Sequence, residues 1–304
     1  MIRQIRPAVL LAFSALVATA ATAADRPALR VVPWTPAGIS SPQYESHAAF
    51  DPRNGDLYFV RSSPSFEGWR IFTSRCESQG WTTPQSPSFA GDGVEADPYF
   101  AAGGNTLYFI STRSTDGIKR KDLDIWQVER DAAGRWGVPQ RLPQPINSTG
   151  NEWFPRPAPD GWLYFGSDRP GGLGKTDIWR AHADSVGHWQ VENLGPAINT
   201  VDNEYEPLPS PDGRTLIVMG AGGLYESHRS DSAMSNDTNP GWSTKVKLGP
   251  EVNATGTELA ALFSPSGRSL MFARDTKGAR SGEFFVWHIT GDEAWPPACP
   301  KPAP

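Results

Sequence analysis

Residues 136–169 read WGVPQRLPQPINSTGNEWFPRPAPDGWLYFGSDR, and residues 189–219 repeat this phrase as WQVENLGPAINTVDNEYEPLPSPDGRTLIVM. Both stretches run from a Trp through an Ile-Asn pair to a Glu, and then through an Asp-Gly pair into an apolar segment. Asp-Gly pairs supply the positive φ angles that tight hairpins need. Each stretch therefore predicts short strands joined by a tight turn.

This phrase recurs along almost the whole chain. The copies open on Trp34, Trp81, Trp136, Trp189 and Trp242, and Trp295 opens a copy that does not continue. After its turn, each copy has an apolar strand such as LYFV and then an aromatic strand such as DIWQV. A period of 47 to 55 residues with four short strands per unit is typical of β-propeller blades.

Five complete copies predict an all-β, five-bladed β-propeller over residues 24–290, followed by a Pro-rich tail over residues 291–304. Because each copy begins with an outer strand, the strand at Trp34 must pair with the last blade and close the ring. A β-sandwich would not give five copies of one phrase. A six-bladed ring would need a blade that lacks both the turn and the apolar strand.

The N-terminal segment has the pattern of a secretory signal. Arg3 and Arg6 precede an apolar run over residues 8–20, and Ala21-Thr22-Ala23 fits a cleavage site. A membrane anchor is the alternative, but the run is shorter than the roughly 20 apolar residues that span a bilayer. We expect a signal peptide over residues 1–23, cleavage near Ala23, and a periplasmic or secreted protein without a membrane span.

Composition and cysteine content narrow the function classes. The 12 Trp and 14 Phe exclude a disordered chain, and the net charge of −5 disfavours nucleic acid as a partner. Export permits disulfides. Ring closure would bring Cys76 near Cys299, so we expect a bond that holds the tail, with a loose tail and poorly paired thiols as the alternative.

Five Glu residues are the most regular polar feature, one per copy at the start of the expected innermost strand. They are Glu45, Glu95, Glu152, Glu204 and Glu258. We expect them at the mouth of the central channel. They either accept hydrogen bonds from the turns or form a ring that holds a cation such as calcium. No other cofactor is expected, and the sequence assigns no metal.

Binding residues are expected where the copies differ. Side chains alternate along a strand, so the second residue after each Glu should share its face of the sheet. Three copies carry a polar residue at this position: His47, Asp97 and Glu206. Another copy carries Arg156 two residues further on, on the same expected face. Together they predict a mixed-charge pocket near the channel.

Residues 151–179, together with the phrase that follows them, resemble the TolB-type propeller repeats of bacterial envelope proteins. The resemblance implies a scaffold that binds a protein or a cell-envelope component without catalysis. The chain lacks the G-x-S-x-G and H-E-x-x-H motifs of hydrolases, and no catalytic residue is assigned.

Two other functions remain open. One is a glycan hydrolase that uses Asp97, Glu206 and one of the five repeated Glu residues in the central channel, with Trp153 and Trp162 stacking on sugar rings. The other is a module that binds a cation or a small ligand.

Overall fold

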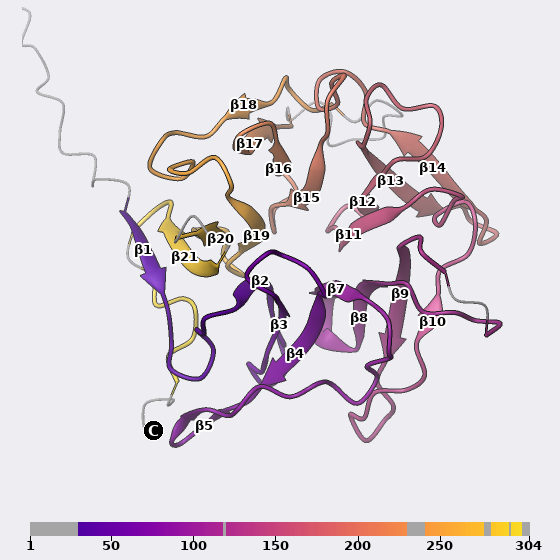
Figure 1. The fold of residues 1–304 in the computed structure, drawn as a ribbon. Coiled ribbons are helices and arrows are strands. Elements are labelled where there is room, and N and C mark those ends of the chain that lie inside the picture. The colour runs from indigo at the N-terminus through magenta and orange to yellow at the C-terminus, as the bar shows by residue number, and fades with distance from the viewer. Residues whose placement is uncertain (1–29, 118–119, 230–240, 277–280, 292, 300–304) are drawn as a thin grey trace, which may run out of the picture.

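Five antiparallel sheets stand around a central axis like the blades of a propeller (Figure 1). The computed structural model describes residues 30–117, 120–229, 241–276, 281–291 and 293–299, so the predicted signal peptide over residues 1–23 lies outside the described part. The helical content of that part is one 3-10 turn, η1 (Ala102–Gly104), and no helix there is long and apolar enough to cross a membrane. The prediction of an all-β, five-bladed propeller is confirmed.

The strands of each blade are given in order from the innermost to the outermost. Blade 1 contains β2 (Tyr44–Phe50), β3 (Leu57–Ser62) and β4 (Arg70–Ser74). Blade 2 contains β7 (Glu95–Phe100), β8 (Thr106–Ser111), β9 (Asp124–Glu129) and β10 (Gln140–Arg141). Blade 3 contains β11 (Glu152–Pro157), β12 (Leu163–Ser167), β13 (Asp177–Ala183) and β14 (Trp189–Asn193).

The last two blades complete the ring. Blade 4 contains β15 (Tyr205–Pro209), β16 (Thr215–Gly220), β17 (Gly223–His228) and β18 (Val246–Lys247). Blade 5 contains β19 (Leu259–Phe263), β20 (Ser269–Asp275), β21 (Gly282–His288) and the N-terminal strand β1 (Arg30–Trp34). A hairpin of β5 (Cys76–Glu77) and β6 (Gly80–Trp81) follows blade 1.

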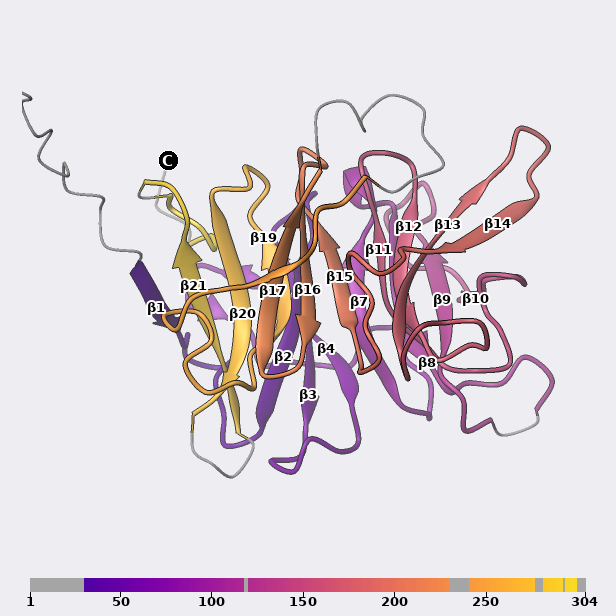
Figure 2. The same ribbon diagram turned by 90° about the horizontal axis from the view of Figure 1, so that it is seen from above.

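The N-terminal strand closes the ring as the sequence predicts. β1 pairs antiparallel with β21, from Arg30 opposite His288 to Trp34 opposite Phe284. Both views show β1 beside β21 (Figures 1 and 2). The innermost strand of blade 5 also contacts that of blade 1, so the first and last blades are neighbours in the closed ring.

The core lies between the blades, and the repeated turns and apolar strands build it. The Gly of the turn pair has a positive φ in all five copies, between 70° and 82°, as the hairpins require. The strands that follow are buried on both faces, and they bring side chains such as Phe59, Phe109 and Phe165 to an exposure of 0%. Burial on both faces explains why these strands are continuous apolar runs.

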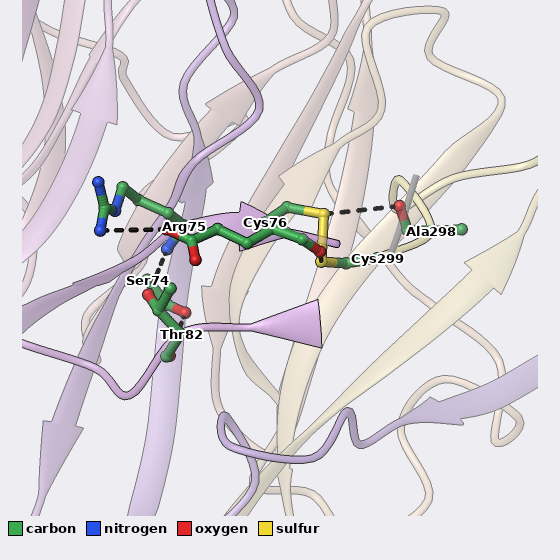
Figure 3. The surroundings of a disulfide bond; sticks show 7 residues. Ser74, Arg75, Cys76, Thr82, Ala298 and Cys299 are labelled. Atoms are coloured by element: carbon green, nitrogen blue, oxygen red, sulfur yellow. Dashed lines mark hydrogen bonds and ion pairs between the residues drawn. A yellow bond between two sulfur atoms is a disulfide. The ribbon is translucent and has the colours of Figure 1, made fainter. Parts of the chain in front are cut away.

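A disulfide joins the tail to blade 1. Cys76 in β5 is bonded to Cys299, with 5.5 Å between the two Cα atoms and a sequence separation of 223 (Figure 3). Nearby, the rings of Trp295 and Phe50 pack edge to face at 5.8 Å. The bond and this packing tether the C-terminal tail to the ring.

Candidate active site

Each innermost strand is interrupted by a β-bulge two residues after the repeated Glu. The residues at these bulges are His47, Asp97, Phe154, Glu206 and Ala260, with φ between 50° and 61°. The pairing register shifts at the same place in every blade. A positive φ is rare outside glycine, and residues held in such conformations cluster at functional sites. The repeated bulge therefore marks this layer of the channel as a candidate functional site.

The bulge also changes where the side chains point. Alternation would put the Glu and the second residue after it on one face, but an extra residue in the strand reverses that pattern. The expectation that the repeated Glu residues share a surface with His47, Asp97 and Glu206 is therefore wrong.

The repeated Glu residues lie inside the blades rather than at the channel mouth. Each is almost fully buried and accepts a backbone N–H from the turn two to four residues before it. Each also pairs with a basic side chain: Glu45 with Arg61, Glu95 with Arg113, Glu152 with Arg169, Glu204 with Lys245 and Glu258 with Arg274. None of the five lines the central cavity, so their role is to anchor the turns.

Glu152 provides a test of this structural role. It accepts hydrogen bonds from the backbone N–H of Ser148 (3.0 Å), from the hydroxyl of Ser167 (2.8 Å) and from Arg169 (3.1 Å). Glu152→Gln is expected to lower the free energy of unfolding by about 2–3 kcal/mol, because buried Arg169 loses its counter-charge. Urea denaturation would measure this, with exposed Glu129→Gln as the matched control. Equal urea midpoints for the two variants would contradict the structural role.

A cavity of about 260 Å³ opens into one end of the channel. Its inner end is formed by His47, Asp97 and Glu206, which are only 2–5% exposed. Half-buried aromatic side chains line the cavity toward the surface; they are Phe66, Trp69, Trp153, Phe154 and Tyr205. The cavity thus combines apolar walls with a few converging polar groups, as ligand sites do.

His47 links two carboxylates that come from blades on different sides of the channel. Its Nε2 atom lies 3.4 Å from Asp97 Oδ1 and 3.3 Å from Glu206 Oε1. Its Nδ1 atom lies 2.9 Å from the hydroxyl of Ser46, and its ring stacks on Phe154 at 5.4 Å. The imidazole is therefore held in one orientation, facing both acids.

Backbone N–H groups of the bulges hold the other oxygens of the two acids. Phe154 N–H donates to Asp97 Oδ2 at 3.2 Å, and Ala260 N–H donates to Glu206 Oε2. In both cases the donor sits at the bulge of the following blade. Each carboxylate is thus fixed through one oxygen and directs the other toward His47.

Arg156 lies beneath this layer rather than on the cavity wall. It is 3% exposed, its guanidinium lies 4.6 Å from the centre of the Tyr99 ring, and it donates to the Pro155 carbonyl at 3.2 Å. Burial lowers the pKa of Arg156, while the nearby charges of Asp97 and Glu206 oppose this shift. Arg156 thus adds positive charge below the two acids.

Burial raises the pKa of Asp97 from 3.8 to about 6, against the opposing effects of His47 and Arg156. Between pH 3.8 and about pH 6, Asp97 keeps a proton in the folded state that it has lost in the unfolded chain. The stability contributed by Asp97 therefore falls as pH rises through this range. Relative to Asp97→Asn, the wild type should lose about 2 kcal/mol between pH 4 and 7. Denaturation of both proteins across this range would measure it, and parallel stability curves would contradict it.

The aromatic residues of the cavity were predicted only in part. Trp153 lies in the wall as expected, but Trp162 packs outside it, against Arg180 at 3.9 Å and His182 at 4.0 Å. Phe66 and Trp69, in the loop between β3 and β4, were missed. Their signal was available, because this pair of aromatic residues occurs at that place only in the first copy.

No group of three His, Cys, Asp or Glu side chains that could hold a metal ion occurs among the described residues. The hypothesis of a cation held by the repeated Glu residues gains no support from their placement, because their oxygens face the turns and basic side chains of their own blades.

No protein-family model matches this sequence, and no curated protein matches it. Several solved structures share the fold. A family 117 glycoside hydrolase from the marine bacterium Zobellia galactanivorans is 12% identical, with a TM-score of 0.52, over 88% of this chain and 92% of that one. A thermostable family-43 glycoside hydrolase is 11% identical, with a TM-score of 0.51, over 89% and 100%.

A third similar structure is the α-L-arabinofuranosidase from Podospora anserina in complex with cellotriose. It is 12% identical, with a TM-score of 0.50, over 84% of this chain and 95% of that one. These likenesses establish the fold. They also correct two expectations: the similar structures are glycoside hydrolase propellers, so both the resemblance to TolB-type repeats and the non-catalytic binding role are wrong.

Proposed function

We propose that the protein is a glycoside hydrolase that acts in the central cavity with Asp97 and Glu206 as its acid and base. The observation that carries the proposal is that these two buried carboxylates converge on one nitrogen of His47. Their facing oxygens therefore lie within about 7 Å of each other, which suits the paired carboxyl groups of glycoside hydrolysis.

The environments of the two acids suggest their roles. Asp97, with a pKa of about 6, can hold a proton and donate it to the glycosidic oxygen as the bond to the leaving sugar breaks. Glu206, which accepts the Ala260 N–H, then attacks the sugar carbon directly or takes a proton from the attacking water. The anomeric configuration of the first product distinguishes these two courses.

His47 is proposed to position the pair. An Nε2–H group shared between Asp97 Oδ1 and Glu206 Oε1 keeps both carboxylates at the inner end of the cavity. The aromatic walls would pack against the apolar faces of a sugar ring and exclude water from the reacting bond.

The rate should depend on pH through Asp97. As pH rises through about 6, Asp97 loses its proton and can no longer act as an acid, so kcat/KM should fall about tenfold per pH unit above that value. Initial rates on a panel of nitrophenyl glycosides between pH 4 and 8 would test this. A rate that rises throughout this range would contradict the assignment of Asp97 as the acid.

We also infer that the protein works in the periplasm or outside the cell. The segment over residues 1–23 has the composition of a signal peptide, and the Cys76–Cys299 bond suits an oxidising compartment. Cell fractionation, with N-terminal sequencing of the recovered protein, would test this; a cytoplasmic protein that retains Met1 would contradict it.

A further inference from the structure

We propose that the cavity accepts a single neutral sugar ring at the end of a glycan, so that the enzyme releases terminal residues one at a time. This inference rests on the proposed function and adds the position of cleavage and the kind of sugar. It depends on the closed inner end of the cavity, on its size and on the charges that face it.

The channel contains two cavities that do not join. The second, of about 500 Å³, opens at the opposite end and is lined by apolar residues such as Phe50, Phe100 and Phe263 and by several prolines. None of the described residues lines both cavities. A glycan chain therefore cannot thread through the ring.

Two side chains form the barrier between the cavities. Tyr99 projects from blade 2 and packs against the core of blades 4 and 5 around Leu208 and Leu270, so it crosses the channel. Arg156 from blade 3 lies against the Tyr99 ring at 4.6 Å. Both lie on the inner side of the His47, Asp97 and Glu206 layer, because they follow the bulges along β7 and β11.

Size and depth then limit what can enter. A volume of about 260 Å³ is below the roughly 300–1,000 Å³ of pockets that take drug-sized ligands, so it suits one ring rather than two. A glycosidic bond must come within about 3 Å of the acids to receive a proton. Because the cavity is closed beyond these acids, a ring that lies against them can only be the last ring of the glycan, and the bond that is cleaved is the one on its outer side.

The charges in the cavity favour a neutral ring. Asp97 and Glu206 line its inner end, whereas Arg156 is buried below and does not reach the wall. A uronic acid or a sulfated sugar would bring an additional negative charge against this acid pair, and like charges at short range repel. The half-buried Trp69 and Trp153 offer faces for the apolar side of a neutral sugar.

The experiment uses neutral arabino-, xylo- and galacto-pentasaccharides labelled with 2-aminobenzamide at the reducing end. Chromatography of early products should show free monosaccharide and a labelled tetrasaccharide. Labelled di- or trisaccharides as the first products would overturn the terminal-ring inference and leave the proposed hydrolase standing.

A binding arm separates failure of the inference from failure of the proposed function. The Asp97→Asn/Glu206→Gln protein is titrated with each monosaccharide and with its pentasaccharide, and calorimetry measures the binding. The two dissociation constants should lie within about threefold of each other. A pentasaccharide that binds more than tenfold tighter would overturn the inference. Binding of a monosaccharide without cleavage by the wild type would overturn the hydrolase alone, and absence of both would overturn both proposals.

A matched pair of variants locates the sugar. Trp69→Ala, in the cavity wall, should weaken monosaccharide binding three- to tenfold. Trp162→Ala, outside the cavity, should leave binding unchanged. Equal effects from the two variants, or no effect from Trp69→Ala, would contradict binding of the sugar ring in this cavity.

Discussion

Replacing Asp97 by Asn or Glu206 by Gln is expected to lower the rate of glycoside hydrolysis by about 10³-fold, which is about 4 kcal/mol in the activation barrier. Asp97→Asn removes the proton that the leaving oxygen needs. Glu206→Gln removes the carboxylate that attacks or activates water. Both amides are nearly isosteric with the acids and can still accept the N–H bonds from Phe154 and Ala260.

Initial rates with a glycoside that the wild type cleaves would measure this loss. The control is Asp131→Asn in an exposed hairpin, where the carboxylate bonds only within its own turn and with Arg135. Near-wild-type turnover in either active-site variant would rule out the proposed acid–base pair. A double variant no slower than each single variant would indicate that the two acids work as a unit.

Removing the Cys76–Cys299 bond has the second large expected effect. A Cys76→Ser/Cys299→Ser protein should lose about 3–5 kcal/mol of stability and about 10 °C in Tm. The bond joins residues at a sequence separation of 223, and such a constraint lowers the entropy of the unfolded chain. It also keeps the tail, with Trp295, against Phe50.

Thermal unfolding of the wild type and the double serine variant, with and without dithiothreitol, would test this prediction. The reductant should lower the Tm of the wild type toward that of the variant and leave the variant unchanged. A wild type and a variant that melt within 2 °C of each other under oxidising conditions would show that the bond adds little to stability.

Comparison of the repeats identified three polar residues that line the cavity, whereas Arg156, singled out in the same way, lies beneath it. His47, Asp97 and Glu206 stand at one position of the repeated phrase, where other copies carry Phe154 or Ala260. A position that differs between otherwise similar blades is free to carry function, whereas the repeated Glu residues do the same structural work in every blade. The folded ring brings these three separate positions together on one axis.

The positions of the β-bulges could not be predicted from the sequence. None of the five residues with a positive φ at these bulges is Gly, so the usual marker of that conformation is missing. The surrounding strands and the contacts across the channel over-determine the backbone there. Simple alternation therefore placed Glu45 and His47 on one face, although the bulge separates them.

The sequence by itself determined the number of blades, the turns, the closure by the N-terminal strand and the polar residues that differ between copies. These features depend on residues that are close in the sequence and on the repetition of one phrase, and both can be read directly from the amino-acid sequence. Only the tertiary structure decided that Asp97 and Glu206 meet at His47, that Phe66 and Trp69 join the cavity wall, and that Arg156 packs on the Tyr99 ring beneath this layer. Those contacts join different blades across the channel, and their geometry depends on backbone bulges and side-chain packing that no local pattern encodes.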